Sequence, residues 1–109
     1  LPIVNPKTDK AVAPAEKTVI DGTYQPLSRP IFVYVKVKSL DKPEVKEFIE
    51  FYMKNASKLT QEVKYVPLPA EAYKMAQDHI NKGKKGTVFG GKNEVGITIE
   101  DLMKREAKM

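Results

Sequence analysis

The stretch Ile31-Phe32-Val33-Tyr34-Val35-Lys36-Val37-Lys38 decides the fold that the sequence predicts. Its side chains alternate between two faces, and its first half is apolar on both faces, which is typical of a β-strand buried inside a sheet. We therefore expect a strand over residues 31–37. Such a strand needs neighbours, yet the other strand candidates, at Ile3, residues 87–89 and residues 94–97, are weak. The missing neighbours are expected to lie elsewhere in a larger protein of which this chain is a fragment, or to come from a second copy of the chain.

Helices are expected on both sides of this strand. Apolar residues that include Val45, Ile49 and Tyr52 recur at the spacing of a helical stripe. Asn55 is expected to break this helix, and Thr98, with Asp101 three residues later, is expected to cap the last one. The predicted helices cover residues 14–21, 42–54, 56–63, 69–81 and 98–107. The fold class that follows is α/β.

The composition limits the chemistry that the chain can perform. Its 109 residues suffice for one domain, and 41% are hydrophobic and 30% charged, as in an ordinary globular protein. It has no cysteine and one histidine, His79, which excludes disulfides, thiolate metal sites and cysteine nucleophiles. No run of 18 apolar residues is present, so no transmembrane span is expected. Neither a metal nor a cofactor is expected.

The net charge of +5 raises the alternative of a small basic module that binds nucleic acid or another polyanion. Two observations disfavour it. The lysines between residues 36 and 54 alternate with acidic residues, and the chain has only two arginines, although the arginine fork is favoured in phosphate-backbone recognition. We therefore expect no nucleic-acid partner.

One loop could cradle an anion. Lysines and glycines are interleaved over residues 82–91, and glycines free backbone N–H groups for a phosphate. The P-loop motif is absent, so the segment is more simply a surface loop. His79, near a helix end, is explained by the helix dipole, and no catalytic residue is expected. The weak anion-site candidates are Lys84, Lys85, Gly86 and Thr87.

A proline-containing connector precedes the strand. Pro26 and Pro30 stand four residues apart in the segment Tyr24-Gln25-Pro26-Leu27-Ser28-Arg29-Pro30. Each proline fixes its own backbone and favours an extended residue before it, so a stiff, extended connector is expected here.

The connector and strand carry a family resemblance. Residues 20–35, Ile-Asp-Gly-Thr-Tyr-Gln-Pro-Leu-Ser-Arg-Pro-Ile-Phe-Val-Tyr-Val, resemble the dGtYpLsRPlfiYv segment of PstS-type phosphate-binding proteins of bacterial phosphate ABC transporters. Residues 42–52 resemble the helix that follows in that family, and residues 63–69 its vgYvPLp turn. Residues 86–91 and 98–102 resemble the branch common in cyanobacteria. The resemblance covers about residues 18–109.

The resemblance implies that the chain is the C-terminal part of a two-lobe, type II periplasmic-binding-protein fold. Residues 1–22 would end the second lobe, residues 23–30 would form the interlobe crossover, and residues 31–109 would complete the first lobe. The family's phosphate ligands match no position here, so none is expected in this segment. The residues implied to act in the hinge are Tyr24, Pro26, Ser28, Arg29 and Pro30.

The resemblance also implies partners and a location. The full-length protein would bind inorganic phosphate and deliver it to an ABC permease, without acting as an enzyme. It would be extracytoplasmic, either periplasmic or anchored on the outer side of the cytoplasmic membrane. This chain would pack against the upstream portion of the same protein. Independently of the resemblance, the apolar faces and free edges of the strand at residues 31–37 predict that the isolated chain forms a homodimer through this unpaired strand.

Overall fold

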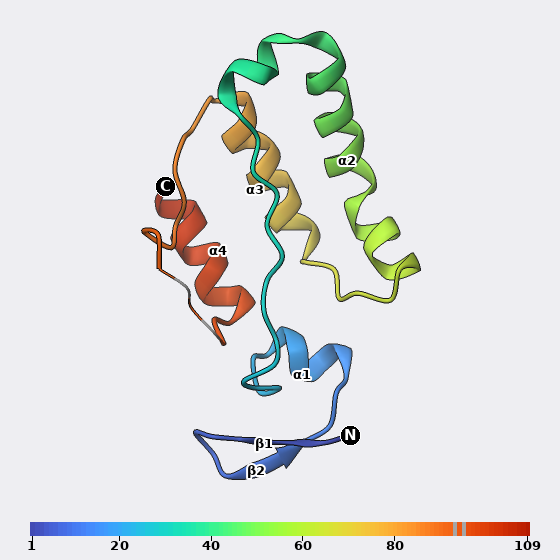
Figure 1. Cartoon of the computed structure of the whole chain (residues 1–109), viewed down its shortest axis with the longest axis vertical. Coiled ribbons are helices and arrows are strands. Elements are labelled where there is room, and N and C mark those ends of the chain that lie inside the picture. The colour runs from blue at the N-terminus through green and yellow to red at the C-terminus, as the bar shows by residue number, and fades with distance from the viewer. Residues whose placement is uncertain (93, 95) are drawn as a thin grey trace. The chain divides into compact units, whose positions relative to one another are not determined.

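The computed structural model describes residues 1–92, 94 and 96–109 (Figure 1). These residues form two compact units: residues 1–31 with residues 87–109, and residues 32–86. The first unit contains an antiparallel strand pair and two helices, and the second contains two longer helices and a 3-10 helix. The expected α/β class is confirmed.

The first unit begins with a β-hairpin. Strand β1 (Ile3–Asn5) pairs with β2 (Lys10–Val12), with Ile3 opposite Val12. The Asn5 carbonyl closes the turn by accepting from the amides of Thr8 at 3.2 Å and Asp9 at 2.8 Å. Asp9 adopts a φ of 53°, a left-handed conformation that aspartate tolerates better than most residues. The sequence signalled the turn, but three-residue strands carry too little pattern to predict the second strand.

Helix α1 (Glu16–Ile20) is shorter than the predicted helix over residues 14–21. The hydroxyl of Thr18 accepts from the Ala15 amide at 3.0 Å, so the first helical turn starts after Ala15 and not at Pro14. Gly22, with a φ of 76°, follows the helix in the left-handed conformation expected of a C-terminal glycine.

Helix α4 (Ile99–Lys108) confirms the last predicted helix within one residue at either end. The Thr98 hydroxyl accepts from the Asp101 amide at 3.1 Å, as expected of an N-cap. Leu102 is buried on this helix, whereas the Lys104–Glu100 ion pair, at 2.6 Å, lies on its exposed side.

The second unit is built on α2 (Pro43–Glu62) and α3 (Ala70–Asn81), which pack against each other, with the 3-10 helix η1 (Val37–Asp41) against α2 (Figure 1). Helix α3 matches the prediction over residues 69–81. The predicted break at Asn55 is wrong, because the helices expected over residues 42–54 and 56–63 are one continuous helix. Asn55 instead donates from its side chain to the Phe51 carbonyl at 2.8 Å, within the helix.

The strand predicted over residues 31–37 is not formed. Residues 31–36 have no strand structure, and the chain enters η1 at Val37. A strand depends on hydrogen bonds to a neighbouring strand, and the two strands among the described residues, β1 and β2, pair with each other. The candidate at residues 87–89 runs into a turn, and the one at residues 94–97 includes Val95, which lies outside the described residues.

Much apolar surface is left uncovered. The buried apolar residues of the described chain are Ile49, Ala56 and Leu102. The apolar residues 31–34 that follow Pro30 are exposed, with Tyr34 at 80%. We call the exposed side chains of α2 its outer face, and they are Phe48, Phe51, Tyr52 and Leu59. The second unit therefore presents two apolar surfaces that require a cover.

Candidate functional site

The crossover predicted at residues 23–30 is a turn over its first half. The Ser28 amide donates to the Tyr24 carbonyl at 3.3 Å, and the Gln25 side-chain amide donates to the Ser28 hydroxyl at 3.0 Å. The expected extended connector is thus wrong for residues 24–28. The φ that proline fixes is compatible with a turn as well as with an extended chain. The two prolines alone therefore could not predict which of these two conformations the segment adopts.

The hairpin and α1 hold the start of the crossover. The Asn5 side chain, which is buried, donates to the Thr23 carbonyl at 2.9 Å. The Asp21 carboxylate accepts from both the hydroxyl of Thr23, at 2.6 Å, and its amide, at 2.9 Å. These hydrogen bonds, with the nearby Lys17 charge, hold the pKa of Asp21 below its ordinary value. The Tyr24 amide donates to the Thr18 carbonyl at 2.9 Å, which ties the crossover to α1.

The segment before α4 lies against Gly22 and Gln25. A Cβ added at Gly22 would lie 3.0 Å from the Thr98 methyl carbon, and one added at Gly96 would lie 2.6 Å from Cδ of Gln25. Both glycines have positive φ, 76° and 82°. Gln25 is 6% exposed, so its side chain is enclosed at this contact. Sequence reasoning missed Asn5, Gln25 and Gly96, because their partners are remote in the chain.

The predicted hinge residues divide into two groups. Tyr24, Ser28 and Pro30 are half-buried, and the first two take part in the turn just described. Pro26 and Arg29 are exposed. Their role in a hinge between lobes stays a prediction.

The weak anion candidates are not gathered into a cradle by any observed contact. Lys84, Lys85 and Gly86 follow α3, and the Lys84 amide donates to the His79 carbonyl at 3.0 Å. A helix C-terminus carries a partial negative charge, which repels anions and attracts lysine. The Thr87 hydroxyl accepts from the Phe89 amide at 3.4 Å. These residues are explained by helix termination and loop geometry.

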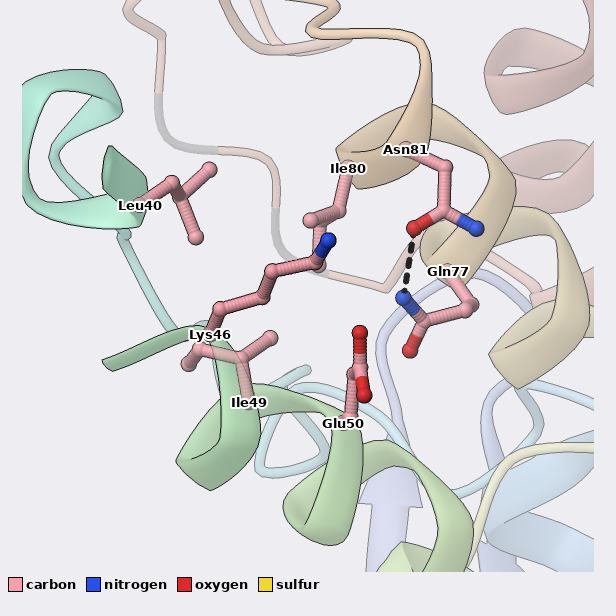
Figure 2. Close-up of a pocket in the computed structure, with 7 residues that line it drawn as sticks. All are labelled: Leu40, Lys46, Ile49, Glu50, Gln77, Ile80 and Asn81. Carbon is pink, nitrogen blue, oxygen red and sulfur yellow. Dashed lines mark hydrogen bonds between the residues drawn. The ribbon is translucent and has the colours of Figure 1, made fainter. Parts of the chain in front are cut away.

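A groove of about 520 Å³ lies between α2, α3 and η1 in the second unit (Figure 2). Leu40, Ile49 and Ile80 form its apolar part. Figure 2 shows Lys46 and Glu50 on α2 and the pair Gln77–Asn81 on α3, whose side chains hydrogen bond at 3.0 Å. Lys46 and Glu50 are exposed, and no contact seen in the groove fixes the position of either charge. The groove therefore lacks the fixed polar groups of a ligand site. His79, 8% exposed, is not among the lining residues.

Other kinds of site find no support among the described residues. No group of three or more histidine, aspartate or glutamate side chains there could hold a metal ion. Within the same residues, no helix has both the length and the apolar character needed to cross a membrane.

An ion pair joins Glu94 to α4, with its side-chain oxygen 2.8 Å from Nη1 of Arg105. This hydrogen bond, assisted by the Arg105 charge, lowers the pKa of Glu94. A carboxyl whose pKa is lower in the folded state stabilises the fold above its unfolded pKa, about 4.3, and loses that contribution as the pH falls through its folded pKa.

We expect Glu94→Gln to lower the thermal unfolding midpoint slightly at pH 7, as for other partly exposed ion pairs. The difference from the parent should shrink as the pH is lowered from 7 to 2, because protonation of Glu94 removes the charge that pairs with Arg105. Circular dichroism melts at both pH values measure this. An equal difference at both would contradict a contribution from the ion pair.

Comparisons with known proteins place these features in context. The chain is 44% identical over 66 residues to the phosphate-binding protein PstS of Staphylococcus haemolyticus, a match that covers 60% of the chain and 21% of the relative. It is 49% identical over 106 residues to protein SphX of Synechococcus elongatus, covering 97% of the chain and 31% of the relative. SphX of a Synechocystis species is 47% identical over 97 residues, covering 88% of the chain and 29% of the relative.

The chain is therefore similar over nearly its whole length to SphX proteins, and more distantly to a phosphate-binding protein. It spans about a third or less of the length of these relatives. No protein-family model matches the chain, and no solved structure matches it.

Proposed function

We propose that this chain is the C-terminal part of an extracytoplasmic phosphate-binding protein with two lobes, which delivers phosphate to an ABC permease. Its own contribution is scaffold and crossover, and the protein is not an enzyme. The observation that carries the proposal is the 49% identity to SphX over 97% of the chain, together with the 44% identity to a PstS protein.

The uncovered apolar surfaces support the view that the chain is part of a larger fold. Residues 31–34 and the outer face of α2 are apolar and exposed, and burying a single phenylalanine or valine contributes about 1.5–3 kcal/mol. Several such side chains in water are costly for a domain whose total stability is about 5–15 kcal/mol. In the proposed protein, strands from the upstream portion pair with residues 31–37, and the sheet covers α2.

In this proposal phosphate is bound outside the segment. Phosphate sites use backbone N–H groups at helix N-termini, hydroxyls and arginine. The crossover, residues 23–30, joins the second lobe, which residues 1–22 complete, to the first lobe, residues 31–109. Tyr24 and Ser28 then shape the crossover through its turn, whereas Arg29 and Pro26 lie on its surface.

The alternative of a nucleic-acid-binding module draws no support from the arrangement of charge. Lys58, Lys82 and Lys104 each pair with an acidic residue four positions away along a helix. Lys84 and Lys85 follow the negative end of α3, which accounts for their position.

The proposal is tested with a chimera. The matching segment of Staphylococcus haemolyticus PstS is replaced by that of this chain, and phosphate binding is measured by calorimetry. Because the segment supplies no ligand, we expect the chimera to bind phosphate within about tenfold of the parent affinity, or about 1.4 kcal/mol. The 109-residue chain alone should give no saturable heat.

A second chimera, in which this chain replaces the matching part of Synechococcus elongatus SphX, guards against a host-specific folding failure. A micromolar one-site isotherm from the isolated chain would overturn the proposal. The proposal would also be overturned if the chimeras fold but none of them binds phosphate, while the parent PstS does.

A further inference from the structure

The first unit joins two pieces of chain that are remote in sequence, residues 1–31 and residues 87–109. Two contacts between the pieces lie at the crossover: Gln25, within it, meets Gly96, and Gly22, immediately before it, meets Thr98. From this geometry we propose that the segment Gly96–Thr98 clamps the crossover, so that α4 sets its conformation. The functional meaning of the clamp rests on the proposed function, but its existence does not.

The first element of the clamp is the Gln25 side chain. It is buried, its amide donates to the Ser28 hydroxyl at 3.0 Å, and Gly96 lies against the same amide group. A Cβ at position 96 would lie 2.9 Å from Gln25 Nε2, so the end of the Gln25 side chain would have to move away from its present position. Gly96 therefore lets the backbone approach a side chain that holds the crossover turn closed.

The second element links the clamp to α4. Thr98 caps α4 through its hydroxyl, while its methyl carbon lies 3.0 Å from the position of a Cβ on Gly22. One residue thus caps the C-terminal helix and lies against the glycine that follows α1. A rearrangement of the crossover would disturb the first turn of α4, and loosening α4 would free the crossover.

The crossover is also held by the hairpin, through the bond from the Asn5 side chain to the Thr23 carbonyl. The crossover is therefore restrained both by the hairpin and by the residues that precede α4. In the proposed protein, where this segment joins the lobes, α4 would restrict the backbone changes available when the lobes move.

The test is hydrogen exchange on the 109-residue chain, with Gly96→Ala compared with Gly91→Ala. Both glycines have positive φ, 82° and 76°, so both variants carry a similar backbone penalty. An added Cβ at Gly91 meets nothing within 4 Å, whereas one at Gly96 meets Gln25. We expect amides of residues 22–28 to exchange about tenfold faster in Gly96→Ala than in Gly91→Ala.

Gln25→Ala supplies the second arm. In this background the clash is removed, so Gly96→Ala should accelerate exchange no more than Gly91→Ala does. Alone, Gln25→Ala should speed exchange in residues 98–102 as well as in 22–28, although the two segments are about 70 residues apart in sequence. This arm stays informative if Gly96→Ala fails to fold.

The clamp would be overturned if folded Gly96→Ala and Gly91→Ala showed equal amide exchange rates in residues 22–28. It would also be overturned if Gln25→Ala changed the exchange rates of residues 22–28 alone. None of these measurements uses phosphate. A failure of the phosphate proposal would therefore leave the clamp standing, and the reverse also holds.

Discussion

Amide exchange across residues 31–36 is expected to be fast in the isolated chain and about a thousandfold slower once the chain is joined to the remaining two thirds of Synechococcus elongatus SphX. The segment is apolar on both faces in its first half but has no strand structure here, with Tyr34 80% exposed. In a sheet its amides would be protected, and a thousandfold change corresponds to about 4 kcal/mol.

Hydrogen exchange read by mass spectrometry on the chain and the chimera measures this. Helix α3 is the internal control, because its hydrogen bonds form within residues 70–81 and need no added strand. If residues 31–36 stay unprotected in a folded chimera, the expected strand does not exist in the larger protein either.

Val33→Pro sharpens the experiment. Proline removes a backbone donor, which costs about 1–3 kcal/mol where a buried partner is left unsatisfied. We expect the substitution to leave the isolated chain unchanged in its thermal transition and to destabilise the chimera. Equal effects on both would show that the segment has the same structure in each.

The isolated chain is also expected to self-associate. Light scattering should give a mass that rises with concentration toward about twice 12.3 kDa, because the outer face of α2 and the exposed segment after Pro30 can cover each other in a symmetric dimer. A clean monomer with a cooperative thermal transition at all concentrations would contradict this expectation.

Substitutions at two adjacent positions of α2 distinguish an effect on self-association from an effect on folding. Phe48 is 61% exposed on the outer face of α2, and Ile49 is 6% exposed beside it. Phe48→Lys should lower the apparent mass while preserving helicity, since a charge opposes burial between copies. Ile49→Lys places the charge in the packed face of α2 and should abolish the thermal transition. Similar behaviour of the two variants would contradict the division of α2 into a packed and an outer face.

The sequence predicted the helices better than it predicted the strands and the turns. The end of α1 at Gly22, the cap at Thr98 and the span of α3 followed from residues within one or two turns of each feature. A helix hydrogen bonds to itself over four residues, so its signals are local. The error at Asn55 has the same origin, because a residue that favours turns elsewhere was accommodated by its bond to Phe51.

The candidate site was predicted less well than the helices. The sequence drew attention to residues 23–30, yet not to the turn at residues 24–28 or to the residues that hold it. Gln25 and Gly96 are 71 positions apart, and nothing near either residue indicates the other. Asn5 and Thr23 are another such pair, 18 positions apart, joined by a side-chain to backbone bond.

By itself, the sequence determined the α/β class, the positions of three of the four α-helices that the structure describes, the lack of thiol chemistry and the apolar character of residues 31–35. Only the tertiary structure decided that α2 is continuous, that residues 31–36 are not a strand in this chain, and that the segment before α4 meets Gly22 and Gln25. The physical reason is the range of the interactions. Helix caps and stripes are satisfied by near neighbours, whereas a strand and a packed turn exist only when a distant segment supplies the other half of each contact.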